Sequence, residues 1–347
     1  MLDSATVTIH RSQFPDAIRS ALVASLRARH ISAKFHYDGT RQTLGWLALH
    51  EALSPARRRS DFRKAYESAF DFLLKATGGG SVHVIGLGCG GGWKEAELIR
   101  RLQAAGRRCV YSPVDVSVPM VITACQTVWA VAEGCECHPV VVDLTEAESI
   151  VSLLEEGPGE KRRLVTCFGV LPNLEPEVIG RQLSSVVRAG DLLGLSANLA
   201  PGPDYRRGTE SVLPQYDNPP TREWLTGILR EVGIGETDGD LRFDVEPTPG
   251  QPGLLRIGAD FVFKRARTVQ IDTHFFAFET GDRLQVFFSC RYTVEQIRGW
   301  LATWGITLLE SWLAEGGEEG VFVCGRERGP GAGHSPARRE RLRASIP

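Results

Sequence analysis

The chain of 347 residues contains neither a long apolar run nor a strong excess of charge. No apolar segment reaches the roughly 18 to 20 residues that a membrane-spanning helix needs. The first residues, MLDSATVTIHR, also lack the apolar stretch of a signal peptide. The formal net charge of -2 provides no basic footprint for nucleic acid. We therefore expect a cytoplasmic protein that acts on neither membranes nor nucleic acids.

The cysteine pattern shows neither a disulfide framework nor a zinc site. The eight cysteines are scattered through segments with the character of core strands and helices, which is typical of reduced thiols. Cys135, Cys137 and His138 are the one cluster of metal-binding side chains, but no second ligand pair follows at zinc-like spacing. The sequence therefore predicts no metal site.

Glycine is plentiful, and several glycines gather in one stretch, Val82 to Lys94, which reads VHVIGLGCGGGWK. The apolar residues before the glycines predict a buried strand, and Glu95–Leu102 predicts a helix after them. A glycine turn between a strand and a helix lets the backbone approach a ligand and presents unpaired N–H groups. This arrangement favours a nucleotide-type ligand, with a tight structural turn as the alternative.

Strands and helices alternate around this turn. The predicted strands are Val82–Ile85, Val110–Val116, Pro139–Leu144, Arg163–Phe168 and Asp191–Leu195. The predicted helices are Phe62–Leu74, Glu95–Leu102, Pro119–Glu133, Glu146–Glu155 and Glu175–Val187. The alternation predicts an α/β fold, in which a parallel sheet carries helices on both faces.

Two acidic residues stand where ligands bind in such a sheet. Asp115 ends the second predicted strand and Asp143 the third, so both lie at the carboxyl edge. The first suits a ribose diol and the second an adenine amino group. Because no second mononucleotide-binding half follows, S-adenosylmethionine (SAM) is favoured over NAD, with helix capping by the aspartates as the alternative. The predicted cofactor contacts are Gly86, Gly88, Gly90, Lys94, Asp115, Asp143 and Leu144.

Other segments break this rhythm. Pro15–Arg29 and Thr43–Leu53 are predicted helices on either side of the turn-forming KFHYDG, whose Tyr37 is a candidate substrate contact or a structural tyrosine. Prolines and glycines interrupt 199–260, where only Thr221–Val232 predicts a clear helix. We expect this stretch to be an inserted substrate-binding module.

The C-terminal third contains two predicted strand pairs. Thr268–Ala277 and Leu284–Tyr292 predict one hairpin. Ile306–Trp312 and Gly320–Cys324 predict an antiparallel pair that closes the main sheet. Beyond them, 327–347 is rich in glycine, proline and arginine without apolar periodicity, so we expect a flexible tail.

Four local patterns in one order resemble the histidine-specific SAM-dependent methyltransferases, a family with members that place three methyl groups on the α-amine of histidine. They are KFHYDG; LGCGGGWK followed by YSPVDVS; GVLPNLEP; and YDNPP followed by FETGDRLQVFFSCRY. The resemblance implies a Rossmann-like class I methyltransferase sheet with an inserted mixed α/β substrate-binding lid domain. It implies a cofactor-binding domain over 61–198 and 290–326, and a lid over 10–60 and 199–289.

The resemblance also implies site residues. It places Asn173 and Tyr216 at the amino-acid end of the substrate. Together with Tyr37 they form the predicted catalytic set, because in-line methyl transfer depends mainly on positioning a neutral amine. From the residues alone, a helix cap at Asn173 and turn packing at Tyr216 are the alternatives.

The chain departs from the family where the substrate side chain is held. The family's Glu-x-Ser reads Phe287-Phe288-Ser289, and its Ile-Glu-Met-His reads Ile257-Gly258-Ala259-Asp260. An imidazole N–H without its carboxylate partner costs about 1 to 3 kcal/mol in a dry pocket. Ala259 leaves room for a larger group. Ala259, Phe287 and Ser289 are thus predicted substrate contacts in a wider, more apolar pocket.

We therefore expect a SAM-dependent enzyme that methylates the α-amino group of an amino acid or amino-acid derivative with an aromatic side chain other than histidine. The alternatives are histidine or a histidine derivative, a non-catalytic SAM-binding relative, and a dehydrogenase. The expected partner is a small amino-acid-like molecule, and we expect a monomer.

Overall fold

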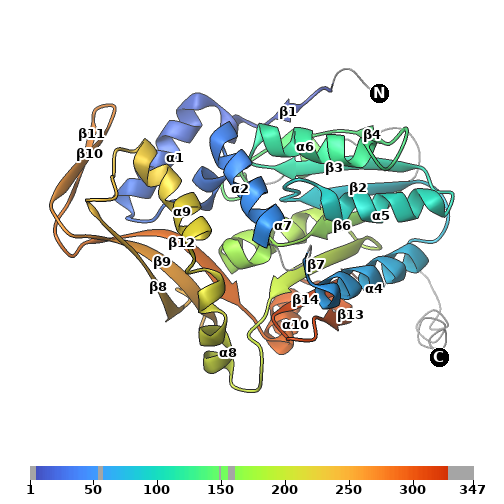
Figure 1. Cartoon of the computed structure of the whole chain (residues 1–347). Helices are drawn as coiled ribbons and strands as arrows, with labels where there is room; N and C mark the ends of the chain where they lie inside the picture. Colours follow the sequence, from blue (N-terminus) through green and yellow to red (C-terminus); the bar gives the residue numbers. More distant parts are fainter. Residues whose placement is uncertain (1–4, 54–57, 148–149, 155–160, 327–347) are drawn as a thin grey trace.

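The computed structural model describes residues 5–53, 58–147, 150–154 and 161–326. Within these residues the centre is a nine-stranded sheet in the order β1-β5-β3-β2-β6-β7-β14-β13, with β4 paired to β3 (Figure 1). The strands are β1 Thr8–Ile9, β2 Val82–Leu87, β3 Cys109–Asp115, β4 Glu136–Cys137, β5 Val140–Val141, β6 Arg162–Cys167, β7 Leu192–Asn198, β13 Thr307–Leu313 and β14 Glu319–Gly325. The strands from β1 to β7 pair in parallel, and β14 and β13 add antiparallel. The predicted antiparallel closure is confirmed.

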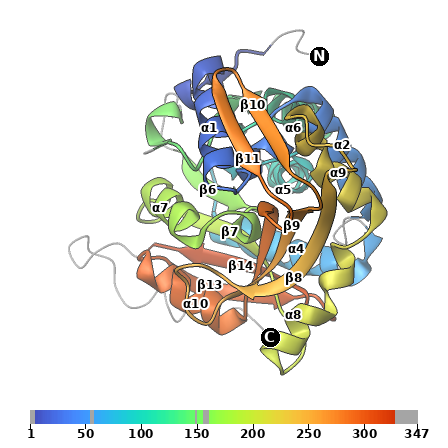
Figure 2. The ribbon, with the colours of Figure 1, turned by 90° about the vertical axis from the view of Figure 1, so that its left-hand side faces the viewer.

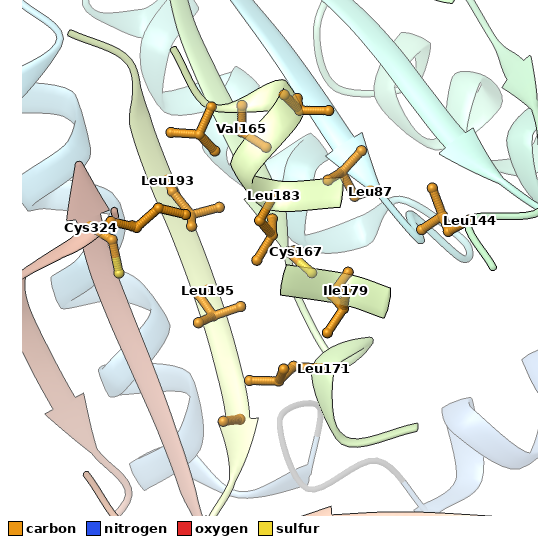
Figure 3. Close-up of a cluster of buried hydrophobic side chains, with 14 of the residues drawn as sticks. Leu87, Leu144, Val165, Cys167, Leu171, Ile179, Leu183, Leu193, Leu195 and Cys324 are labelled. Atoms are coloured by element: carbon orange, nitrogen blue, oxygen red, sulfur yellow. The ribbon is translucent and has the colours of Figure 1, made fainter. Parts of the chain in front are cut away.

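Helices cover both faces of this sheet. They are α4 Ser60–Ala76, α5 Trp93–Ala104 and α6 Val118–Trp129 on one face, and α7 Pro176–Val186 and α10 Val294–Thr303 on the other. Strand β2 is buried along its whole length, as a parallel strand covered on two faces should be. Figure 3 shows the second face, where Ile179 and Leu183 of α7 share a buried cluster with Val165, Leu193 and Leu195. The α/β fold class is confirmed.

A second, antiparallel sheet forms a core of its own. It contains β8 Gly239–Pro247, β9 Leu255–Phe263 and β12 Arg283–Arg291, in the order β12-β9-β8. It packs with α1 Pro15–Arg27, η2 Ala33–His36 and α9 Pro219–Glu231, and α8 Tyr205–Ser211 precedes α9. Helix α2 Thr40–Leu53 contacts both α9 and α6, so it bridges the two sheets. The sequence did not predict the pair β8–β9, and the division into two domains stays a prediction.

The predicted hairpin of Thr268–Ala277 with Leu284–Tyr292 is wrong. The first segment is itself a hairpin, β10 Arg267–Ile271 and β11 His274–Phe278, which turns at Asp272 with a φ of 50°. Strand β12 pairs with β9 instead. The reason is a turn without glycine, which carries little signal in the sequence. Figure 2 shows this ribbon beside α1.

The predicted helix Glu146–Glu155 is also absent from its described part, which contains only the single turn η3 Val151–Leu153. The Asp143 carboxylate accepts hydrogen bonds from the Thr145 N–H and hydroxyl, and such a local turn competes with helix initiation. Residues 148, 149 and 155 lie outside the described residues, as does the predicted tail 327–347. None of the described helices is long and apolar enough to cross a membrane.

Candidate active site

A cavity opens over the carboxyl ends of β2 and β3, and it brings most of the predicted site residues together. Its lining includes the predicted cofactor contacts Gly88, Gly90, Lys94, Asp115, Asp143 and Leu144, and the predicted substrate contacts Tyr37 and Asn173. These residues come from the turn after β2, from α5, from the end of β3, from the loop after β5, from the C-cap of η2 and from η4 Leu171–Asn173. The strand ends therefore meet at one edge, as the parallel sheet requires.

The glycine turn is held tightly against its neighbours. Gly88 has a φ of 60°, and a Cβ there would lie 2.2 Å from Cγ2 of Val170. Gly90 has a φ of 50°, and a Cβ there would lie 2.8 Å from the ring of Trp46 on α2. Both positions therefore need glycine for the backbone conformation and for space.

Asp115 is tied to the same turn. Its Oδ2 accepts the Gly90 N–H at 3.0 Å, and its Oδ1 accepts the Ser117 N–H at 3.3 Å. Burial raises the pKa of the Asp115 carboxyl to about 6, although these N–H groups act in the opposite direction. The carboxylate at the end of β3 is thus fixed beside the glycines, where a ribose diol can donate to it.

Asp143 differs from Asp115 because it is already paired. Lys34 Nζ lies 3.0 Å from Asp143 Oδ2, and both side chains are only 3% exposed. The Thr145 N–H and hydroxyl donate hydrogen bonds to Asp143 Oδ1 at 2.8 Å and 2.6 Å. An adenine amino group would therefore approach an ion pair rather than a free carboxylate.

Gly86 lies inside β2, two residues before the lining begins at Gly88. A Cβ there would come within 3.3 Å of Glu95 Cγ and of the Tyr111 hydroxyl. Its predicted role as a cofactor contact stays a prediction, and its evident effect is to leave room for the Glu95 side chain.

Tyr37 and Asn173 both line the cavity, although they are far apart in the sequence. The Tyr37 ring contacts Trp46 and Trp224, with centroid distances of 6.0 Å and 5.6 Å. Burial raises the pKa of the Tyr37 hydroxyl, so it keeps its proton at neutral pH. Asn173 Oδ1 is buried and has no hydrogen-bond partner among the described residues. Since Glu175 is the N-cap of α7, the helix-cap alternative for Asn173 does not hold.

Tyr216, Phe287, Ser289 and Ala259 do not line this cavity. The register pairs Phe287 with Ala259 and puts Ser289 two residues along the same strand. The Phe287 ring lies 6.1 Å from Trp224 and 6.0 Å from Tyr216, so a row of rings connects the cluster to Tyr37 in the cavity. The predicted substrate contacts thus form a neighbouring cluster.

Hydrogen bonds fix the direction of each donor in that cluster. Arg291 Nη2 donates to the Tyr216 hydroxyl at 2.7 Å, and Asn198 Nδ2 donates to it at 3.1 Å. The Tyr216 proton is therefore left for Ser289 Oγ, 3.0 Å away, which also receives Asn198 Nδ2 at 3.2 Å. Both acceptor positions of Ser289 are filled, so it does not offer an acceptor to an imidazole N–H.

Several lining residues were missed by sequence reasoning. Trp46, His50, Trp93 and Glu95 line the cavity, and the rings of Trp46 and His50 stack with centroids 4.7 Å apart. The spacing of four residues between Trp46 and His50 on a predicted helix was an available signal. Asn198 was missed as well, and it belongs to the cluster of Tyr216 and Ser289 rather than to the cavity lining. It is the last residue of β7, so its position at a strand end was a signal of the kind that identified Asp115.

A glycine turn after β2, an acid at the end of β3 and a cavity across both strand ends are the features of a nucleotide-type cofactor site in a Rossmann-like sheet. The glycine turn and the Asp115 carboxylate suit the adenosyl part of SAM. The chain belongs to the family of histidine-specific, SAM-dependent methyltransferases, whose model matches residues 67–326. It is an enzyme of this family, with a Rossmann-like sheet and SAM as cofactor.

Similar solved structures include the CcbJ methyltransferase from Streptomyces caelestis, 11% identical over 76% of this chain and 90% of that one, with a TM-score of 0.39. Another is the magnesium protoporphyrin IX methyltransferase from Synechocystis PCC 6803 with bound SAH, 17% identical over 90% of this chain and 99% of that one, with a TM-score of 0.38. These identities are too low to transfer substrates or residue roles. No curated protein matches the chain in sequence.

Proposed function

We propose that the enzyme methylates the α-amino group of an amino acid or amino-acid derivative whose side chain is aromatic and other than histidine. One observation supports an amine as the substrate group. Asn173 Oδ1 is a buried hydrogen-bond acceptor without a partner among the described residues, and Asn173 lines the same cavity as the predicted cofactor contacts. A substrate N–H would satisfy this acceptor, and an unsatisfied one costs about 1 to 3 kcal/mol.

The chemistry asks little of the protein beyond positioning. SAM supplies the methyl group when bound. Asn173 would hold one N–H of a neutral amine, so that the nitrogen lone pair points at the donor. Tyr37 retains its proton and would contribute a hydroxyl to the same amino-acid end. Well-oriented reactants of this kind gain about 7 to 11 kcal/mol of barrier reduction. This mechanism requires no covalent intermediate with the protein.

The cluster on β12 supports an aromatic side chain. Phe287 stands between Trp224 and Tyr216, and Ala259 opposite it adds little volume. Ser289 already accepts two hydrogen bonds, and Phe287 offers none. A flat apolar side chain has no N–H group, so it needs no hydrogen-bond acceptor in these surroundings. An imidazole N–H would give up its hydrogen bond to water and find no acceptor in the cluster. For an indole or phenol, Tyr37 is the available acceptor.

Histidine itself is the second candidate, because the family as a whole is described as histidine-specific. Ser289 is present at the position that grips the ring in that family. A different grip on the imidazole, with Tyr37 or Asn173 as acceptor, would be needed.

The test is a methyl-transfer screen of the protein amino acids and simple aromatic derivatives with SAM, read by mass for one, two or three added methyl groups. Preferred turnover of an aromatic amino acid is the expected result. Clear preference for histidine would overturn the aromatic assignment. Absence of turnover with every amine, while S-adenosylhomocysteine (SAH) still binds, would indicate a non-catalytic relative.

A further inference from the structure

The first turn of α5 places two opposite charges side by side at the cavity. Lys94 and Glu95 are consecutive, and both line the cavity immediately after the glycine turn. Glu95 is only 4% exposed, although it is a carboxylic acid. A buried acid beside a cation needs an explanation, because each loses hydration. The explanation lies in what each side chain contacts.

Residues of the main sheet surround the Glu95 side chain. The Thr166 hydroxyl on β6 donates to its Oε1 at 2.9 Å. Gly86 on β2 leaves space for its stem, since a Cβ there would lie 3.3 Å from Glu95 Cγ. Burial raises the pKa of the Glu95 carboxyl because it disfavours the ionised form. A cation that binds beside this carboxyl would favour the ionised form again.

Lys94 is held from behind by a chain of hydrogen bonds. Lys94 Nζ donates to the Tyr66 hydroxyl at 2.7 Å, and Tyr66 donates to Oε1 of Glu319 at 2.5 Å. The ammonium also lies 4.5 Å from the centre of the Tyr66 ring and 5.7 Å from that of Phe168. Burial lowers the pKa of Lys94. Tyr66 and Glu319, from α4 and β14, thus hold the ammonium of a side chain that lines the cavity, and the ammonium has two further protons to donate.

Two of the charged side chains that line the cavity complement the amino-acid end of SAM. Lys34 and Asp143 neutralise each other at 3.0 Å. Lys94, Glu95 and Asp115 are the other Lys, Asp and Glu side chains of the lining, with one positive and two negative charges when ionised. SAM carries an α-carboxylate, an α-ammonium and a sulfonium, one negative and two positive charges. Asp115 lies with the glycine turn, where the ribose belongs, so Lys94 and Glu95 are left for the methionine end.

We propose that Glu95 binds the α-ammonium group of SAM, and that Tyr66 and Glu319 position Lys94 for the α-carboxylate. Glu95 is then a cofactor-binding residue, whereas Tyr66 and Glu319 are positioning residues that act through Lys94. This assignment concerns the methyl donor and holds whichever amine is methylated. An amino acid that accepts the methyl group also has an α-carboxylate and an α-amino group. The experiment must therefore separate binding of SAM, the methyl donor, from binding of the amino-acid substrate.

The test uses three ligands in isothermal titration with the full chain. SAH has both charged groups, decarboxylated SAH keeps only the amine, and 5'-methylthioadenosine has neither. Glu95→Gln should weaken SAH and its decarboxylated analogue roughly ten- to a hundredfold, the range of a charge-assisted hydrogen bond, and leave methylthioadenosine unchanged. Glu97→Gln is the matched control on the same helix, since Glu97 pairs outward with Arg100 and Arg101. It should change none of the three affinities.

The positioning residues have a different signature. Tyr66→Phe and Glu319→Gln should each weaken SAH roughly three- to tenfold and leave the decarboxylated analogue unchanged. The double variant should lose no more than Tyr66→Phe alone, because both changes break one chain of hydrogen bonds. Additive losses would show that Glu319 does not act through Tyr66 and would overturn this part.

Two results would overturn the Glu95 assignment. An equal loss of methylthioadenosine affinity would mean that Glu95 only shapes the pocket. Unchanged SAH affinity together with a raised KM for the amine would assign the charges to the acceptor. Should Glu95→Gln fail to fold, Glu95→Asp keeps the charge on a shorter stem, and a loss specific to the amine-bearing ligands is again expected.

Discussion

The donor half and the acceptor half of the site are built in different ways. The proposed donor residues Gly88 to Glu95, Asp115 and Asp143 follow three neighbouring strands of the main sheet, β2, β3 and β5, and meet at its carboxyl edge. The proposed acceptor residues are Tyr37 at the C-cap of η2, Asn173 of η4, Tyr216 in the loop before α9 and Phe287 of β12, and these segments are far apart in the chain. Chemistry common to all methyl transfer is thus encoded locally, whereas substrate choice depends on long-range assembly.

The largest effect is expected at the donor half. Asp115→Ala should weaken SAH binding roughly a hundredfold, because the carboxylate accepts the Gly90 N–H and would also accept hydrogen bonds from the ribose diol. Isothermal titration measures this directly. Asp240→Ala, on the surface beside Lys264, is the control and should bind SAH normally. Wild-type affinity in Asp115→Ala would place the cofactor elsewhere.

The glycine turn provides a second large effect. Gly88→Ala should lower the free energy of unfolding by about 1 to 3 kcal/mol, since the new Cβ meets Val170 Cγ2 at 2.2 Å and φ is 60°. Gly106→Ala is matched in φ, at 78°, but meets nothing within 4 Å. The difference between the two variants in chemical denaturation isolates the clash, and adding Val170→Ala should recover part of it. Equal losses for both glycines would contradict this account.

The contrast between locally encoded and long-range parts of the site also explains which residues could be predicted from the sequence. Asp115 and Asp143 were found because strand ends in a parallel sheet meet at one edge. The pair β8–β9 was missed although Leu241 and Phe243 alternate with exposed residues, because nearby prolines and glycines obscured the period of two. The contact of Trp46 with Gly90 could not be predicted, since it depends on how α2 packs over the main sheet.

The pH dependence of cofactor binding tests the Asp115 environment. Its pKa is raised to about 6, against about 3.9 in an unfolded chain. Between these values the folded protein holds a proton that the unfolded chain has released, so this group's contribution to the free energy of unfolding falls as pH rises from about 4 to 6. Binding needs the carboxylate, so SAH affinity should rise about tenfold from pH 5 to pH 7. A shallower profile is expected for Asp115→Asn, because only the proposed Glu95 contact would still titrate. The wild-type slope in that variant would show that Asp115 does not cause the pH dependence.

A smaller effect belongs to the acceptor half. Asn173→Ala should raise the KM for the preferred amine about fivefold, as expected from losing one hydrogen bond, and leave SAH affinity unchanged. Steady-state kinetics and titration of the same preparation measure both. A parallel loss of SAH affinity would move Asn173 to the donor half.

The smallest effect is expected outside both halves. Removing 327–347 should leave the melting temperature and activity unchanged, because the composition of this segment provides no apolar face to bury. A large drop in melting temperature would show that the segment docks.

We propose that the enzyme binds SAM as a methyltransferase of its family should, but that its substrate pocket no longer binds the imidazole ring of histidine, because Phe287 stands where the family has a carboxylate. The most direct measurement is the ratio of kcat/KM for histidine to that for the best aromatic substrate, in the wild type, Phe287→Glu and the uncharged control Phe287→Gln. We predict a ratio below one in the wild type, a rise of roughly ten- to a hundredfold in Phe287→Glu, and little change in Phe287→Gln. A wild type that prefers histidine, with no gain from the new carboxylate, would contradict the account.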